Sequence, residues 1–298
     1  MRLKRFALIT LLFVFALTAC TVSKQLKQLG IQAQYQYKEG NYAEAYSLYD
    51  EIISIKTGQG KDAEANVYQN AGIAALHVDR VSDAINYLEQ VKERSSANAQ
   101  TYYYISKAYL KVDNLSREII NLEEFTRMYP DEEEIADVNH QLFMAYVRSE
   151  NWDKAHRQWT LLSSKQQEGV LTIEGYVEVV QHLGHTNEVL SLAKKLLQSD
   201  SKNVLALEVL AVHYYNLAEN SYQSEMKAYE KNRTNRQYKQ LLAALKVINK
   251  NFKTSSDYFE SLYKLKPEPR FANYLGNIYT RFENKSKANY YYSKTEQN

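Results

Sequence analysis

The sequence predicts an all-α protein made of repeated helical hairpins, and three observations carry this prediction. Glycine and proline are scarce, with nine and three in 298 residues, and neither occurs between His185 and Lys266. Without them most turn types are hard to build, whereas the abundant Ala, Leu, Lys, Glu and Gln favour helix. Finally, similar segments recur at a spacing close to 34 residues, which is the signature of stacked repeats.

The first element is an N-terminal targeting segment over residues 1–19. Three basic residues precede an apolar run over 6–17 that is too short to cross a bilayer. The chain's only cysteine, Cys20, ends the segment L-T-A-C, which resembles the bacterial lipobox. The resemblance implies that the Cys20 thiol is lipidated and that residues 20–29 form an acylated tether. The alternative is an ordinary signal peptide with an incidental cysteine.

Removal of this segment would lower the formal charge of the chain from +2 to about −1, because Arg2, Lys4 and Arg5 leave with it. No overall basic field remains, so nucleic acid is not an expected partner. No long apolar segment follows Cys20, so we expect the attachment to the membrane to be through the lipid alone.

Residues 30–203 contain five repeats and residues 268–298 a last one. The six repeats align on these segments: G-N-Y-A-E-A (40–45), D-R-V-S-D-A (79–84), D-N-L-S-R-E (113–118), E-N-W-D-K-A (150–155), G-H-T-N-E-V (184–189) and E-N-K-S-K-A (283–288). A large residue usually follows four positions later and an apolar one three beyond that. Glu118 and Val189 replace the small residue that ends the other segments.

This pattern resembles the tetratricopeptide repeat (TPR), a helix–turn–helix unit of 34 residues in which a small residue lets the two helices approach closely. The resemblance implies a right-handed TPR-type solenoid of about six to seven hairpins, in which each hairpin needs neighbours to bury its apolar face. An irregular helical bundle is the alternative.

Residues 204–267 depart from the repeat. We expect two long helices with a break near Asn232 to Asn235, forming an inserted hairpin that protrudes by several turns. Its side chains are strongly basic, and we assign a basic arm to Lys231, Arg233, Arg236 and Lys239. The hairpin is either a solvated surface or a docking arm for an acidic partner or for phospholipid head groups.

The sequence contains no H-E-x-x-H, no Gly-rich phosphate loop, no G-x-S-x-G and no paired cysteines. Glu178, His182 and His185 share one helical stretch, but we interpret them as polar surface rather than as a metal site. We therefore expect no enzyme, no cofactor and no bound metal.

The TPR resemblance implies a concave groove lined by the first helix of each repeat. Carried over to this chain, the groove residues are Gln69, Ile73, His77, Tyr103, Lys107, Lys111, His140, Met144, Arg148, Glu174, Glu178, His182, Asn273, Asn277 and Arg281. Lys107, Lys111 and Arg148 predict a cationic stretch that would hold an acidic segment or a peptide carboxylate. The alternative is an ordinary polar helix surface.

Together these features predict a non-enzymatic, membrane-anchored scaffold that binds other envelope proteins. We expect a Gram-negative envelope, with the protein on the periplasmic side of the outer membrane, because Thr21 rather than Asp follows Cys20. The Tyr, Asn and Lys content is typical of Bacteroidota. A part in outer-membrane protein assembly or in a secretion machine, a helper for peptidoglycan enzymes, and a ligand-capture lipoprotein remain open.

Overall fold

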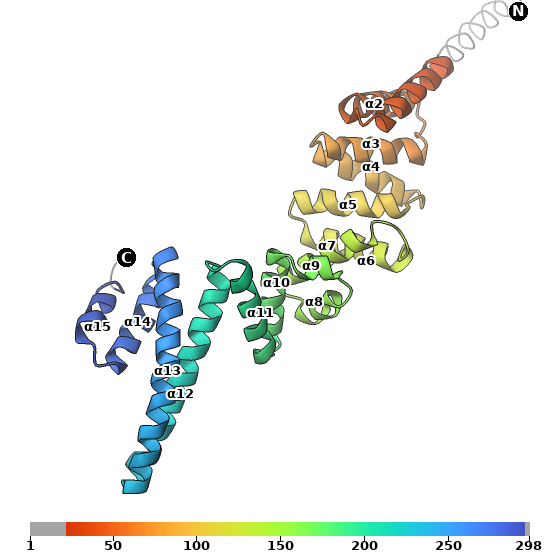
Figure 1. Ribbon diagram of the computed structural model, residues 1–298. Helices are drawn as coiled ribbons and strands as arrows, with labels where there is room; N and C mark the ends of the chain where they lie inside the picture. The colour runs from red at the N-terminus through yellow and green to blue at the C-terminus, as the bar shows by residue number, and fades with distance from the viewer. Residues whose placement is uncertain (1–21, 296–298) are drawn as a thin grey trace, which may run out of the picture. The chain divides into compact units, whose positions relative to one another are not determined.

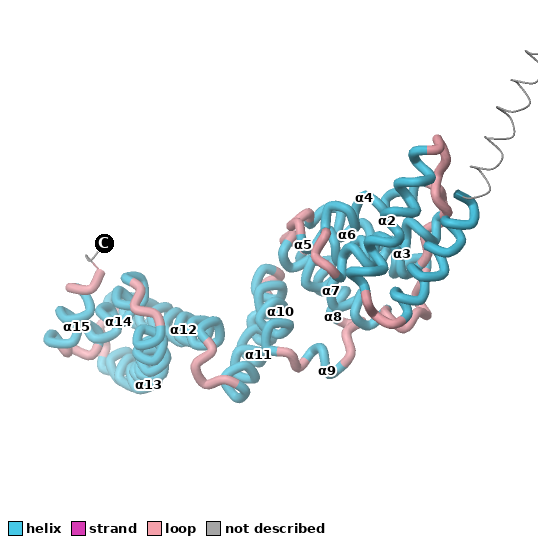
Figure 2. Tube along the Cα trace, turned by 90° about the horizontal axis from the view of Figure 1, so that it is seen from above, coloured by secondary structure: helices cyan, strands magenta, loops and turns pink. Residues whose placement is uncertain are grey.

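The computed structural model describes residues 22–295, and these residues form helices and short turns with no strand among them (Figures 1 and 2). This confirms the predicted all-α fold of paired helices. The predicted signal segment and Cys20 lie outside the described residues. Within the described range, no helix is long and apolar enough to span a membrane.

The chain forms two compact units that divide between Glu150 and Asn151. In the part of the first unit that the structure describes, a helix over residues 22–38 is followed by six more helices: α2 (Tyr42–Gly58), α3 (Ala65–His77), α4 (Val81–Glu93), α5 (Ala99–Lys111), α6 (Leu115–Met128) and α7 (Ile135–Arg148). Helices α3 and α4, and then α5 and α6, pack as hairpins. Each hairpin also packs against the next through α4 with α5 and α6 with α7.

Up to residue 295, the second unit contains eight helices: α8 (Trp152–Trp159), α9 (Ser164–Gln167), α10 (Val170–His182), α11 (Thr186–Ser199), α12 (Val204–Lys231), α13 (Asn235–Leu265), α14 (Pro269–Arg281) and α15 (Lys285–Tyr292). The hairpins are α10 with α11, α12 with α13, and α14 with α15. Helix α8 is only eight residues long, and the chain then turns into α9, where the Ser163 side chain caps the helix. Leu162 is still buried at the position that the repeat pattern assigns to it.

The turn inside each repeat hairpin uses one left-handed residue. Glycine takes this position only at Gly40 and Gly184; Asp79, Asp113, Glu150 and Glu283 adopt it with φ between 54° and 62°. These six residues are the first residues of the six aligned segments. At Asp113, its N–H donates to Leu110 O (3.1 Å) and the Asn114 N–H donates to Tyr109 O (2.9 Å). This pair of bonds is the Schellman arrangement that ends a helix.

The last residue of each aligned segment lies at a close approach of two helices. Ala45, Ala84, Ala155 and Ala288 are buried, and so is the larger Val189. A Cβ added to Gly72 of α3 would lie 2.7 Å from Leu88 Cγ of α4, and one added to Gly276 of α14 would lie 2.5 Å from the Tyr292 ring of α15. The α3–α4 and α14–α15 hairpins therefore have small residues on both sides of the helix–helix contact, where a larger side chain would force the neighbour to shift.

Tyrosines connect successive hairpins. On the first helix of a hairpin, Tyr109 donates to Glu89 (2.7 Å) and Tyr279 donates to Glu260 (2.5 Å), in each case on the second helix of the preceding hairpin. Tyr146 makes the same bond to Glu123 (2.8 Å). In each case the ring is buried while the hydroxyl reaches a carboxylate at the edge, a contact that phenylalanine could not make.

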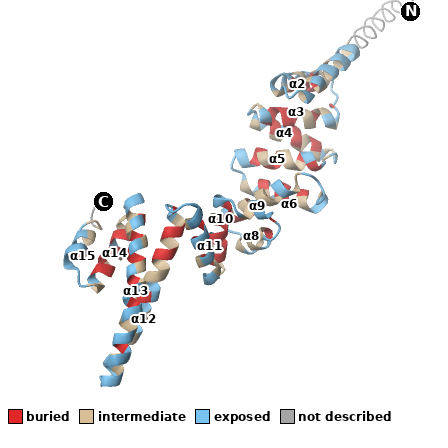
Figure 3. Ribbon diagram, viewed as in Figure 1, coloured by how far each residue is buried: buried red, intermediate tan, exposed pale blue. Residues whose placement is uncertain are grey.

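Helices α12 and α13 form the expected long hairpin, with a break at Asn232 to Thr234. Near α11 and α14 its core contains Leu207, Phe252 and Phe259. The distal end is exposed, as Figure 3 shows by the pale blue residues there. Helix α12 has 28 residues, so the hairpin is about 40 Å long.

Candidate functional site

Lys107 of the predicted groove does not stand free. The Tyr103 hydroxyl donates to Asp137 Oδ2 (2.7 Å), and the Lys107 ammonium lies 3.4 Å from the same oxygen. The ammonium also lies 4.0 Å from the centre of the Tyr103 ring. Burial, followed by the hydrogen bond to Asp137, raises the pKa of Tyr103, so the phenol stays neutral. Gln141 also donates to Asp137 Oδ2 (2.7 Å), so these side chains form one polar cluster on α5 and α7.

The other two predicted cations are also paired. Lys111 Nζ lies 2.7 Å from Asp79 Oδ1. Arg148 Nη2 lies 2.7 Å from both oxygens of Glu118, a carboxylate that is only 1% exposed. Each cation of the expected stretch is therefore compensated by a carboxylate, and the net positive stretch predicted there is not present in the structure.

His77 and Gln69 are held by neighbouring repeats. The His77 ring stacks on Tyr42 with centroids 3.8 Å apart, and its centroid lies 5.9 Å from that of Tyr104. Gln69 donates to Gln100 (3.2 Å) and accepts from Thr101 (3.3 Å). Ile73, which the repeat pattern also assigned to the groove, is fully buried against Leu88 and Ile105 and is a core residue.

The predicted groove residues of α7 and of the second unit differ in exposure. His140 and Met144 on α7 are half-buried, whereas Glu178, His182 and Asn273 are exposed. Glu174 accepts a hydrogen bond from Asn203 (2.6 Å), and Asn277 accepts one from Tyr292 (2.9 Å). Arg281 contacts Glu219 through two nitrogens and lies over the Tyr222 ring, so it fixes α14 to the inserted hairpin.

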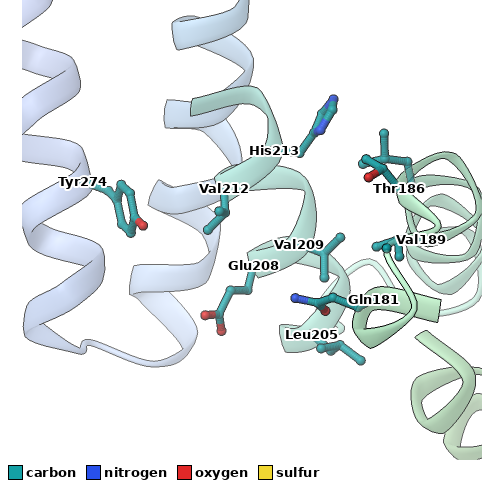
Figure 4. A pocket seen from close by; sticks show the side chains of 11 residues that line it. Gln181, Thr186, Val189, Leu205, Glu208, Val209, Val212, His213 and Tyr274 are labelled. Carbon is teal, nitrogen blue, oxygen red and sulfur yellow. The ribbon is translucent and has the colours of Figure 1, made fainter. Parts of the chain in front are cut away.

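The second unit contains an open pocket of about 510 Å³ that none of the sequence patterns predicted. Helix α12 supplies its floor, and α11, the end of α10 and one residue of α14 supply its walls. Figure 4 shows Leu205 and Val209 turned toward α11, and Glu208 and Val212 turned toward Tyr274. The lining residues are Gln181, Gly184, Thr186, Val189, Leu190, Leu205, Glu208, Val209, Val212, His213 and Tyr274.

The lining combines an apolar centre with a few fixed polar groups. The Glu208 carboxylate pairs with the Arg270 guanidinium (Oε2 to Nη2, 3.0 Å). Burial, and then the nearby Lys194 charge, lower the pKa of His213, so its ring is neutral at pH 7 and both donates and accepts hydrogen bonds. The Tyr274 ring is held between Phe259 (4.6 Å) and Tyr215 (4.8 Å).

Of the predicted groove residues, His182 and Asn273 are sequence neighbours of the pocket residues Gln181 and Tyr274, and neither of them lines the pocket. The sequence feature that could have predicted the pocket lies in the irregular unit, where residues 204–217 carry apolar side chains on more than one helical face. Leu207 and Leu210 are buried, while Leu205, Val209 and Val212 are half-buried. An apolar second face on a repeat helix predicts a further contact.

The basic residues assigned to the arm are all exposed, and they lie at the distal end of the hairpin. Lys231 ends α12, Arg233 lies in the turn, and Arg236 and Lys239 begin α13. Across residues 22–295 no group of His, Cys, Asp and Glu has the arrangement of a metal site.

Comparisons with known proteins agree with this architecture. The C-terminal part of a TPR repeat-containing protein from Cytophaga hutchinsonii is 14% identical, with a TM-score of 0.53 over 89% of this chain and 93% of that one. A structure from Bacteroides ovatus, described as a candidate protein-binding protein, is 19% identical, with a TM-score of 0.52 over 75% of this chain and 99% of that one. These likenesses establish the TPR fold.

Among curated proteins, the chicken (Gallus gallus) DnaJ homolog subfamily C member 3 is 23% identical in an alignment 265 residues long that covers 83% of this chain. The chain spans about half the length of that relative (51%). No family model matches the sequence.

Proposed function

We propose that this protein is a non-enzymatic scaffold of the cell envelope, attached to the membrane by a lipid on Cys20, that binds an extended segment of a partner protein in the pocket on α12. The observation that carries the proposal is the pocket itself: a hollow lined by both aliphatic and polar side chains of packed helices. Sites of about 300–1,000 Å³ with an apolar lining and few polar groups are typical binding sites.

The pocket fits an apolar side chain together with its flanking peptide groups. Val189, Leu205 and Val209 offer aliphatic contact, and each buried methylene contributes about 0.8 kcal/mol. Gln181 and the neutral His213 lie at the rim, where each provides a donor and an acceptor for a peptide backbone. The pocket contains no nucleophile–base pair, which favours binding rather than chemistry.

The membrane attachment rests on the sequence. L-T-A-C follows a basic and then an apolar segment, and a lipid-modified Cys20 would explain the single cysteine. Acylation with more than one chain gives stable anchoring. Thr21 after Cys20, in place of the Asp that retains some lipoproteins in the inner membrane, supports placement at the outer membrane. On its periplasmic side, envelope proteins would be the accessible partners.

Peptide selection tests the pocket. Phage-displayed random peptides selected on the purified soluble part of the chain should share an apolar anchor. Val209→Trp fills the pocket, and we expect it to weaken their binding at least tenfold, which is the loss of about 1.4 kcal/mol. Val170→Trp, at the start of α10 and 39% exposed, is the matched control and should bind as the wild type does. Equal binding by both variants would refute the pocket assignment.

Acylation tests the anchor separately. Cys20→Ala should abolish incorporation of labelled palmitate and release the protein from the membrane fraction, or leave an uncleaved precursor. Unchanged labelling in this variant would contradict the lipobox assignment without bearing on the pocket.

A further inference from the structure

The outer face of α13 carries a continuous basic stripe. Arg236, Lys239, Lys246, Lys250 and Lys253 are all exposed. With Ala243 they follow alternating steps of three and four residues, so they lie along one side of the helix. The opposite side carries Leu241, Ile248 and Phe252, which are buried, and the last two belong to the core shared with α12.

The stripe has a single sign of charge. Between Lys227 and Lys253 the only acidic residue is Glu230, on α12. Among the described residues, Lys253 pairs with Asp257, whereas no carboxylate pairs with the other four cations. This differs from the predicted groove, where every cation has an acidic partner. Rows of like charge on a helix are destabilising, so a stripe kept free of carboxylates indicates a partner that supplies them.

Apolar side chains border the stripe. Leu242 is 44% exposed and Val247 is 61% exposed, and by the helical rotation of 100° per residue they lie on its two sides. The basic residues at the tip are arranged differently. Lys227 and Lys231 are exposed, and by the helical rotation of 100° per residue they lie opposite the buried Ala211 and Ala218 of α12. Arg233 lies in the turn, so these three residues are not part of the stripe.

We propose that the stripe of α13 docks an acidic amphipathic α-helix of a partner protein. The stripe is about 26 Å long, and its cations lie about 4.5–6 Å apart along the helix except across Ala243, where Lys239 and Lys246 are about 10.5 Å apart. Glutamates placed three and four residues apart on a second helix have matching spacings. Leucines beside those glutamates would cover Leu242 and Val247. The acidic helix would lie along α13 on the side opposite α12.

The geometry favours a helix over a lipid surface. A helix that lies on a bilayer has its apolar residues at the centre of the buried face and its cations at the edges. On α13 the order is reversed, with cations along the centre and Leu242 and Val247 at the edges. A bilayer would also attract the tip residues as strongly as the stripe, because head groups impose no register.

A labelled helical peptide of about 21 residues, long enough to span the stripe, tests the proposal. One peptide carries glutamates in alternating steps of three and four with leucines beside them; a second has the same composition with the glutamates spread around the helix. Fluorescence anisotropy with the soluble part of the chain should show at least about tenfold tighter binding of the first. Equal affinity for both peptides, or no binding of the first, would overturn the proposal.

Two charge-matched variants locate the contact. Lys239→Glu/Lys246→Glu/Lys250→Glu reverses the stripe, and Lys227→Glu/Lys231→Glu/Arg233→Glu reverses the tip by the same net charge. We expect the first to weaken binding of the striped peptide at least tenfold and the second to change it less than about threefold. If circular dichroism shows loss of helix in the first variant, the corresponding Gln substitutions replace it. Equal losses in both variants would mean unspecific attraction.

Binding to vesicles of phosphatidylglycerol tests the alternative, in which the hairpin contacts a lipid surface. Two results together would assign the hairpin to a lipid surface instead: the chain binds the vesicles tightly and both triple variants abolish this binding equally, and the chain binds the two peptides with equal affinity. Val209→Trp should leave binding of the striped peptide unchanged, so failure here and failure of the pocket proposal are distinguishable.

Discussion

Replacement of Arg148 by Met should leave the Glu118 carboxylate buried without its counter-ion. In the structure both Glu118 oxygens lie 2.7 Å from Arg148 Nη2, and Glu118 is 1% exposed whereas Arg148 is 36% exposed. Burial raises the pKa of Glu118, and the hydrogen bonds and charge of Arg148 oppose this rise. Without Arg148 the carboxyl group has to become neutral, because an unpaired buried charge costs more.

The free-energy cost of protonating Glu118 sets the size of the destabilisation. Protonation at pH 7 of a carboxyl group whose ordinary pKa is 4.5 costs at most about 3.4 kcal/mol, and at pH 5 about 0.7 kcal/mol. In the variant the folded state binds this proton more tightly than the unfolded state does. Its stability is therefore highest below the ordinary pKa and decreases as the pH rises.

Urea-induced unfolding at pH 7 and pH 5 measures this cost. The reference is the double variant Glu118→Ala/Arg148→Met, which lacks the same guanidinium but restores the small residue typical of the repeat. We expect the single variant to be less stable than the double variant by about 3 kcal/mol at pH 7 and by less than about 1 kcal/mol at pH 5. If the two variants were equally stable, or if their difference in stability did not change with pH, the conclusion that Arg148 compensates a buried Glu118 carboxylate would be refuted.

Three further predictions concern the repeat architecture. Ala84→Trp should destabilise the α3–α4 hairpin by about 3 kcal/mol or more, because Ala84 is fully buried, whereas the exposed Asn86→Trp should be nearly silent; the reverse order in thermal melts would contradict the repeat register. Glu283→Gly should raise stability by about 0.5–1 kcal/mol, because φ is 56° at this exposed turn residue and left-handed backbone is costly for residues with a Cβ; a lower melting temperature would contradict this. Burial, then the hydrogen bond to Glu89, raises the pKa of Tyr109 to about 12, so its contribution to stability should be intact below pH 10 and lost between pH 10 and 12; Tyr109→Phe should reduce the alkaline loss of stability measured by circular dichroism, and an unchanged slope would contradict it.

The sequence by itself determined the helical hairpins and their register. Turn residues such as Asp79 and Gly184, and small residues such as Ala84, act over a few neighbouring positions, so their spacing is visible along the chain. The left-handed φ of Asp79 and Gly184 and the burial of Ala84 agree with the aligned segments. The long inserted hairpin could also be predicted, because an unbroken helical composition and a break near Asn232 are local features too.

Only the tertiary structure decided which charges are paired and where the pocket lies. Arg148 meets Glu118 from 30 positions away, and no local pattern indicates that the predicted groove cations are compensated. The pocket needs side chains from four helices. On the hairpin, Lys231 and Lys239 are close in the sequence. In the structure Lys231 ends α12, whereas Lys239 belongs to the basic stripe on the exposed face of α13. Electrostatic pairing and pocket shape depend on distances across the fold, which spacing along the chain does not contain.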